Sequence, residues 1–203
     1  MNKSIEHYVF HKENFLDEKF CENSINVLNK NDWKTHTWYF PRTDSVNVKS
    51  RDEPDVIGGT TFSNSEALTV GSTYELHGIN EFIIDNLHSA ILEYVKSLKF
   101  KWFDEWQGYN VVKFIRYRPG QIMQNHCDHI HSMFDGERKG IPILSIIGIL
   151  NDDYEGGELI MFEDKKIDTK KGDLLVFPSN FLYPHKVAPV TKGVRYSYVS
   201  WVW

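Results

Sequence analysis

The 203-residue sequence has little of three features that mark whole classes of protein: cysteine, long apolar runs and excess positive charge. Its two cysteines, Cys21 and Cys127, are too few for a disulfide framework and favour a reducing compartment. No apolar run approaches the ~20 residues that a membrane-spanning helix needs, and the first residues do not resemble a signal peptide. There are 23 Lys and Arg against 28 Asp and Glu, whereas nucleic-acid-binding proteins usually carry a basic stripe. We therefore expect a cytoplasmic protein with neither a membrane nor nucleic acid as its partner.

Aromatic residues, by contrast, are plentiful and make up 14% of the chain. Aromatic side chains pack well on pleated surfaces, so this composition favours a core rich in β-structure. A chain of this length can bury enough surface to fold as one unit. We expect residues 1–203 to form a single domain.

The first hundred residues predict helices around a polar loop. Apolar residues recur at helical spacing over residues 14–30 and, more regularly, over residues 78–98. Between them, residues 42–59 are charged and end in two glycines, which is typical of a long loop. Long loops in compact domains are more often functional than idle, so residues 42–59 are a candidate lid over a site.

After residue 100 the pattern changes to short apolar runs separated by turn signals such as Pro119-Gly120 and Gly156-Gly157. The expected strands are residues 110–118, 122–128, 143–151, 158–163, 173–178, 185–190 and 194–203. Strands at this spacing predict a sandwich or barrel rather than alternating strands and helices. The expected fold class is α+β, with a double-stranded β-helix (a jelly-roll or cupin-like core) over residues 110–203, braced by helices from residues 1–100.

One short motif, His126-Cys127-Asp128, points to metal chemistry. In a strand, residues two apart share a face, so His126 and Asp128 would point together and Cys127 away. A second imidazole from a distant strand, for which His185 is the candidate, would complete a triad of two histidines and one carboxylate. That triad suits Fe(II) and leaves coordination positions open. A shifted register that uses His129 and His131 remains an alternative.

A second motif, Arg195-x-Ser197, follows His185 by ten residues. Both side chains share one face of the last predicted strand. An arginine that points into a barrel is costly unless it meets an anion, and guanidinium geometry matches a carboxylate. The pattern therefore predicts a carboxylate clamp beside the metal site.

Taken together, these motifs resemble the Fe(II)- and 2-oxoglutarate-dependent dioxygenases, specifically the prolyl 4-hydroxylase-like group. The stretches that carry the resemblance are FIRYRPGQIMQNHCDH, ILSIIGILNDDYEGGELIMF, KKGDLLVFPSNFLYPHKVAPV and GVRYSYVSWVW. They cover roughly residues 110–203.

The resemblance implies a role for each matching residue. The catalytic iron ligands would be His126, Asp128 and His185. The co-substrate 2-oxoglutarate would be bound by Arg195, Ser197 and Tyr117, and the substrate would contact Trp201. The implied reaction uses Fe(II), 2-oxoglutarate and O2, with ascorbate as a candidate reductant, and releases succinate and CO2.

The sequence departs from the family where some prolyl hydroxylases place a tyrosine that reaches the co-substrate. Here the candidates are Ile147, Gly148 and Ile149, none of which carries a hydroxyl. The catalytic residues therefore transfer better than the substrate pocket. We expect hydroxylation of a prolyl residue in a peptide or protein. A hydroxylase of free amino acids and a non-catalytic jelly-roll binding module remain alternatives. Demethylation of nucleic acid is disfavoured, because those relatives carry an arginine at the position of Trp201.

Overall fold

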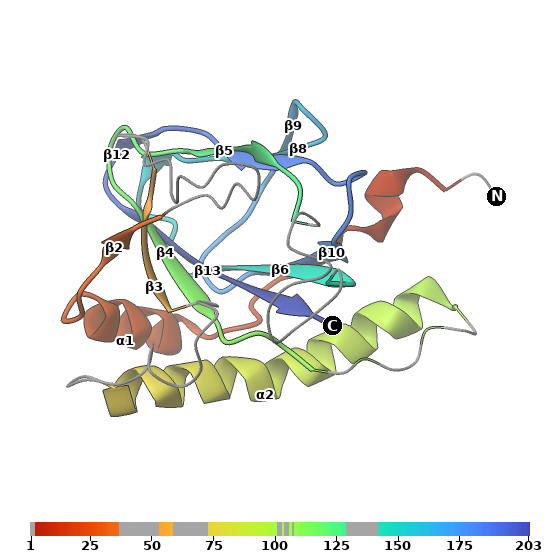
Figure 1. The fold of residues 1–203 in the computed structure, drawn as a ribbon, viewed down its shortest axis with the longest axis horizontal. Helices are drawn as coiled ribbons and strands as arrows, with labels where there is room; N and C mark the ends of the chain where they lie inside the picture. The colour runs from red at the N-terminus through yellow and green to blue at the C-terminus, as the bar shows by residue number, and fades with distance from the viewer. Residues whose placement is uncertain are drawn as a thin grey trace, which may run out of the picture.

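The computed structural model describes residues 3–36, 53–58, 73–100, 103, 106, 108–128 and 142–203. Over these residues two helices lie under a pair of facing sheets (Figure 1). The helices are α1 (Glu18–Leu28) and α2 (Thr73–Leu98), and a 3-10 turn, η1 (Ile5–Tyr8), precedes them.

The larger sheet has seven strands in the order β1-β10-β6-β13-β4-β3-β2, and its neighbours are antiparallel. The bounds of these strands are β1 Phe10–Lys12, β2 Lys34–Thr35, β3 Asp55–Gly58, β4 Lys113–Tyr117, β6 Leu144–Ile149, β10 Leu174–Pro178 and β13 Arg195–Val202. The smaller sheet has the order β5-β11-β8-β9, and β12 pairs with β7. The bounds of these strands are β5 Met123–His126, β7 Glu155–Gly156, β8 Leu159–Met161, β9 Lys165–Ile167, β11 His185–Val187 and β12 Val190–Lys192.

Alternation along the strands divides the core into two clusters. One cluster lies between the helices and the outer face of the larger sheet, and Tyr196, Tyr198 and Val202 of β13 belong to it. The other fills the space between the two sheets, which we call the lumen, and includes Ile115 and Tyr117 of β4. Because successive residues of a strand face opposite sides, the odd-numbered residues of β13 face the lumen. The sequence of each strand thus determines which side chains can take part in a site between the sheets.

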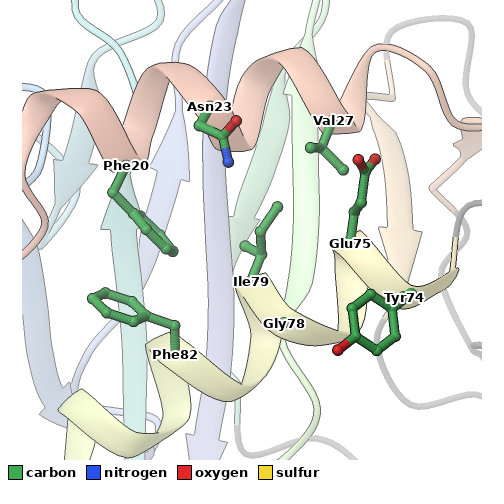
Figure 2. A pocket seen from close by; sticks show the side chains of 8 residues that line it. All are labelled: Phe20, Asn23, Val27, Tyr74, Glu75, Gly78, Ile79 and Phe82. Atoms are coloured by element: carbon green, nitrogen blue, oxygen red, sulfur yellow. The ribbon is translucent and has the colours of Figure 1, made fainter.

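The two helices brace the larger sheet and pack against each other (Figure 1). Asp17 caps α1, since its side chain accepts a hydrogen bond from the backbone N–H of Phe20. The ring of Phe20 stacks on that of Phe82 in α2, with centroids 4.4 Å apart, over a shallow pocket between the helices (Figure 2). Within the described residues, no helix is long and apolar enough to cross a membrane.

The predicted fold class is confirmed. Both predicted helices are present, although α1 is shorter than expected and α2 begins five residues earlier. Each of the seven predicted runs contains a strand, and residues 185–190 divide between β11 and the start of β12. Gly148, one candidate neighbour of the co-substrate, faces the helices instead, where a Cβ would lie 1.9 Å from Cζ of Tyr198.

The first hundred residues contribute more than helices and loop. β1 pairs with β10 at one edge of the larger sheet, and β3 pairs with β4 near the other. Residues 53–58 fall inside the range 42–59 that was expected to be a loop, and for them that prediction is wrong. The strand escapes sequence inspection because it has only two apolar residues, Val56 and Ile57, and forms through non-local pairing. The rest of the expected lid lies outside the described residues.

Candidate active site

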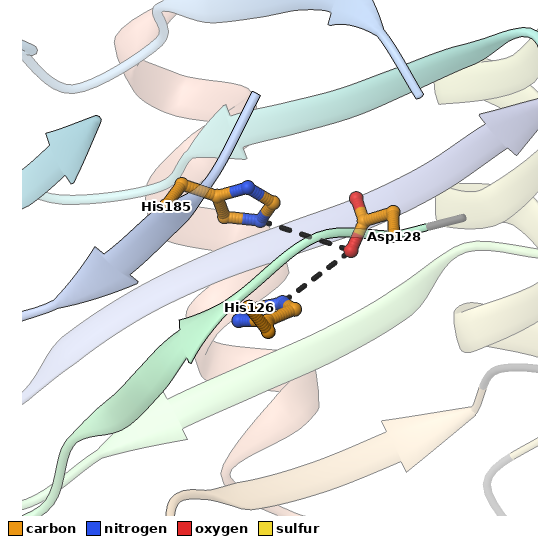
Figure 3. A group of neighbouring side chains, drawn as sticks. All are labelled: His126, Asp128 and His185. Atoms are coloured by element: carbon orange, nitrogen blue, oxygen red, sulfur yellow. Dashed lines mark ion pairs between the residues drawn. The ribbon is translucent and has the colours of Figure 1, made fainter. Parts of the chain in front are cut away.

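His126, Asp128 and His185 come together at one end of the lumen (Figure 3). His126 ends β5, Asp128 follows two residues later, and His185 begins β11, directly opposite His126 in the pairing of the two strands. Their potential ligand atoms all lie within 4.8 Å of one another. Oδ1 of Asp128 is 3.3 Å from Nε2 of His126 and 3.7 Å from Nε2 of His185. This is the donor set of a facial metal site.

Backbone carbonyls fix the orientation of both imidazoles. Nδ1 of His126 is 2.7 Å from the carbonyl of Gln124, and Nδ1 of His185 is 3.1 Å from the carbonyl of Tyr183. A proton on each Nδ1 would be donated to these carbonyls, which leaves the Nε2 lone pairs free to bind a metal. The strand pairing and these two contacts therefore pre-organise the site.

The triad is also electrostatically coupled. Burial alone would raise the pKa of Asp128, but the charge of His185, together with the hydrogen bond and the charge of His126, holds it well below its usual range. Burial alone would lower the pKa of His126, yet its hydrogen bond and ion pair with Asp128 raise it above the ordinary value. Burial lowers the pKa of His185. The carboxylate is therefore ionised and ready to bind a cation.

Sequence inspection missed Ser145 of β6, a buried residue whose hydroxyl is near enough to Asp128 to help lower the pKa of that carboxyl. Its Oγ also lies 3.0 Å from Oγ of Ser179. The register places Ser145 opposite Trp201 of β13, so both belong to the lumen wall beside the triad. Ser145 lies two and four residues before Ile147 and Ile149, which both face the lumen. Strand alternation could therefore have placed Ser145 on the same face.

Replacing Ser145 with alanine is expected to weaken Fe(II) binding by about 10–100-fold, the usual effect of losing a group that orients a metal ligand. The carboxylate of Asp128 would lose a neighbouring hydroxyl that favours its ionised form. The measurement is a titration of the metal-free protein with Fe(II) under anaerobic conditions. Ser200→Ala is the matched control, because Ser200 is equally buried but lies on the helix side, where it donates to the carbonyl of Asn110. Equal affinity in Ser145→Ala and the wild type would contradict this role.

Arg195 lies in the lumen wall formed by β13 and is only 1% exposed. Its Nη1 donates to Oγ of Ser197 at 2.8 Å, and its guanidinium carbon lies 5.1 Å from the ring centroid of Tyr117, its direct partner on β4. Nε and Nη2 of Arg195 are buried and have no hydrogen-bond partner among the described residues. A buried guanidinium with two unused donors fits a carboxylate that binds both of them.

Tyr117 supports this interpretation of the Arg195 site. Burial raises the pKa of Tyr117 to about 12, although the charge of Arg195 opposes the shift. Its hydroxyl therefore stays protonated at neutral pH and can donate a hydrogen bond to an anion. Arg195, Ser197 and Tyr117 thus fit the distal carboxylate of 2-oxoglutarate, and the triad fits Fe(II).

The remaining predicted residues divide between the described and the undescribed parts of the chain. Trp201 is partly exposed and lies on the lumen side of β13, two residues beyond Val199. His129 and His131, the alternative ligands, lie outside the described residues. Cys127 points away from the triad, with Sγ 3.5 Å from the carbonyl of Phe181.

Lys113, at the start of β4, is a second residue of the lumen wall that sequence inspection missed. It lies two and four residues before Ile115 and Tyr117, so it shares their lumen-facing side of the strand, and it lies opposite Val199 of β13. Burial lowers the pKa of Lys113 to about 8, while the charges of Asp128 and Glu53 partly oppose the shift. A cation therefore lies close to the metal site.

Comparison with known proteins agrees with this geometry. Residues 112–203 match the family model described as the 2OG-Fe(II) oxygenase superfamily. A PKHD-type hydroxylase of Idiomarina loihiensis is 36% identical over 90 residues, which are 43% of this chain and 39% of the relative. A PKHD-type hydroxylase of Delftia acidovorans is 30% identical over 131 residues, 61% of this chain and 53% of the relative. The chain spans about half or less of the length of these relatives.

Solved structures match over nearly the whole chain. The viral collagen prolyl hydroxylase of Paramecium bursaria Chlorella virus-1, in its 2OG complex, has a TM-score of 0.59 at 18% identity, with 96% of this chain and 94% of that chain covered. A prolyl hydroxylase of Trichoplax adhaerens, in complex with a hypoxia-inducible-factor peptide, has a TM-score of 0.61 at 20% identity, with 97% and 84% covered. At these identities the likeness establishes a common fold.

Proposed function

We propose that this chain, which belongs over residues 112–203 to the 2OG-Fe(II) oxygenase superfamily and is prolyl 4-hydroxylase-like, hydroxylates an unactivated C–H bond. Its co-substrates would be 2-oxoglutarate and O2, and its products would include succinate and CO2. The observation that carries the proposal is the pairing of two sites in one lumen: a two-histidine, one-carboxylate triad and a buried arginine with unused donors. The triad alone would fit any divalent metal and the arginine alone any small anion, whereas the combination fits a metal-bound keto acid.

Each part of the lumen has a distinct task in this proposal. Bound iron would supply the oxidative decarboxylation and the oxygen chemistry. His126, Asp128 and His185 would hold it through two Nε2 atoms and a carboxylate oxygen. Arg195 and Ser197 would fix the far end of 2-oxoglutarate and so orient it towards the metal. The apolar side chains of the lumen exclude water from the reacting groups.

The substrate that we propose first is a prolyl residue in a peptide or protein. The support comes from relatives named PKHD-type hydroxylases and from neighbours named prolyl hydroxylases, one of them in complex with a peptide. Trp201, beside the triad on β13, is the proposed substrate contact. Ascorbate as reductant and a cytoplasmic location stay predictions of the same proposal.

The second candidate is a hydroxylase of free amino acids. One observation favours it: Lys113 places a cation in the lumen wall near the metal site, where it could meet the carboxylate of a small substrate. A non-catalytic binding module is less well supported, because such a module gives no reason to bury Arg195 with unused donors.

Turnover tests the proposal directly. The Fe(II)-loaded protein is incubated with 2-oxoglutarate and O2, and succinate is measured with and without proline-containing peptides or free amino acids. We expect succinate formation that a substrate stimulates and that requires iron. A folded, iron-loaded protein that forms no succinate above the metal-free control with any of these substrates would contradict the proposed activity.

A further inference from the structure

The lumen-facing residues of the larger sheet form rows that run across its strands. One row holds Ser145 of β6 and Trp201 of β13. The next holds Ile147, Val199 and Lys113. Because the hydroxyl of Ser145 is near enough to Asp128 to help lower the pKa of that carboxyl, the first row lies beside the triad. Lys113 is therefore one row away from the metal site, next to the proposed substrate contact Trp201.

Lys113 and Arg195 are separated along the sheet. Arg195 pairs with Tyr117, which lies four residues beyond Lys113 on β4. Four residues of a strand span about 13 Å, so the backbone positions of the two cations are well separated along the sheet. A single carboxylate bound by Arg195, Ser197 and Tyr117 does not need Lys113 as well.

The ammonium of Lys113 has no hydrogen bond and no ion pair within the part of the chain that the structure describes. The charges that act on it are Asp128, of the triad, and Glu53. Glu53 is 1% exposed and already has a partner in His36, whose Nδ1 is 3.2 Å from its carboxylate. Asp128 would be occupied by a bound metal. A partly buried cation is thus left facing the substrate side of the lumen without a close anion of its own among these residues.

We infer that Lys113 is a specificity-determining residue that binds a carboxylate of the substrate close to the carbon that is hydroxylated. The inference rests on the proposed function and adds a chemical class to it: an anionic substrate. That carboxylate could be the α-carboxylate of a free amino acid or the side chain of an acidic residue next to a proline in a peptide. A lysine recognises both as a point charge, so the experiment has to distinguish them.

The first arm of the experiment reads binding without turnover. Protein labelled with 13C at the lysine ε-carbon is loaded with Zn(II) and 2-oxoglutarate, and the signal of Lys113 is assigned by its absence in Lys113→Arg. The probes are L-proline against L-prolinamide, and a Pro-Glu peptide against the same peptide with Pro-Gln. We expect the Lys113 signal to shift with a carboxylate probe and not with its amide partner. A response to L-proline alone identifies an α-carboxylate, and a response to the Pro-Glu peptide alone identifies an acidic peptide.

Two results of this arm would overturn the inference. A Lys113 signal that stays unmoved by every carboxylate probe would show that the residue does not bind such a group. A signal that shifts when 2-oxoglutarate is added, and not further with any probe, would assign Lys113 to the co-substrate.

The second arm compares steady-state kinetics of Lys113→Gln, Lys113→Arg and the wild type. Loss of a hydrogen-bonded charge should raise KM for the carboxylate substrate by about 10–100-fold, with kcat little changed. KM for the amide should stay unchanged, and Lys113→Arg should retain the preference for the carboxylate substrate over its amide.

Lys166→Gln is the control, because Lys166 is exposed and pairs with Glu158 on the smaller sheet. A Lys113→Gln enzyme with the wild-type preference would contradict the inference. Failure of the proposed function itself would look different, since the wild type would then form no succinate at all.

Discussion

Replacing His126, Asp128 or His185 with alanine is expected to abolish Fe(II) binding while the chain stays folded. Each variant removes one of three protein ligands, so affinity should fall by more than the ~100-fold that loss of a merely orienting group can cost. The measurement is an anaerobic Fe(II) titration of the metal-free variants, with circular dichroism to check the fold. His77→Ala is the control, because His77 is an exposed residue of α2 that pairs with Glu81. A fully active His126→Ala protein would show that the ligands are wrongly assigned.

The same triad predicts how Fe(II) affinity depends on pH. The pKa of His126 is raised by Asp128, so in the metal-free protein this ion pair stabilises the fold at low pH and is lost as the pH rises through the folded-state pKa. Iron needs the neutral imidazole, and its binding must release that proton. Fe(II) affinity should therefore rise with pH through the pKa of His126 and then level off. Asp128, whose pKa lies well below its usual range, is ionised throughout. Affinity that does not change with pH over this range would contradict the coupling.

Replacing Arg195 with methionine is expected to weaken 2-oxoglutarate binding without destabilising the fold. Removing one partner of a buried charge pair typically costs about 2–5 kcal/mol, so affinity for 2-oxoglutarate should fall by roughly 30- to 5,000-fold. The free energy of unfolding without co-substrate should stay the same or increase. Nε and Nη2 of Arg195 are buried without partners in the described part of the chain, and methionine removes the desolvation cost of these unpaired groups. Calorimetric titration with 2-oxoglutarate and denaturant unfolding measure the two effects.

The control for Arg195 is Arg116→Met. Arg116 lies on β4 one residue before Tyr117, but its side chain lies on the opposite face of the sheet, where it pairs with Asp55 and lies over the ring of Trp33. This variant should lose the ion pair with Asp55 and keep its affinity for 2-oxoglutarate. If Arg195→Met binds 2-oxoglutarate as tightly as the wild type, the co-substrate site has been misplaced.

The sequence was most informative where function is tied to fixed spacing. His126 and Asp128 are two residues apart, and His185, Arg195 and Ser197 follow in strands that their own apolar alternation predicts. The identities of these residues and the strand period together determine which face they occupy. The triad and the arginine could therefore be named from the sequence, and the carboxylate-binding role of Arg195 stays a prediction that its burial supports.

Residues whose roles depend on pairing between distant strands were missed. Ser145 and Lys113 are ordinary strand residues until the register places one beside Asp128 and the other opposite Val199. β1 and β3 are short, and each is stabilised by a neighbouring strand more than 50 residues away in the chain. The local spacing of apolar residues does not indicate which distant strands will pair.

The most direct test of the proposed active site is spectroscopic and needs no substrate. Fe(II) and then 2-oxoglutarate are added to the metal-free protein under anaerobic conditions, and the visible charge-transfer absorption of a chelated keto acid is recorded. The wild type should develop the band, His185→Ala should not, and Arg195→Met should need much more 2-oxoglutarate to reach it. A folded wild-type protein that binds both components without the band, or an Arg195→Met band that forms at the wild-type concentration, would contradict a lumen in which the triad and Arg195 hold the two ends of one co-substrate.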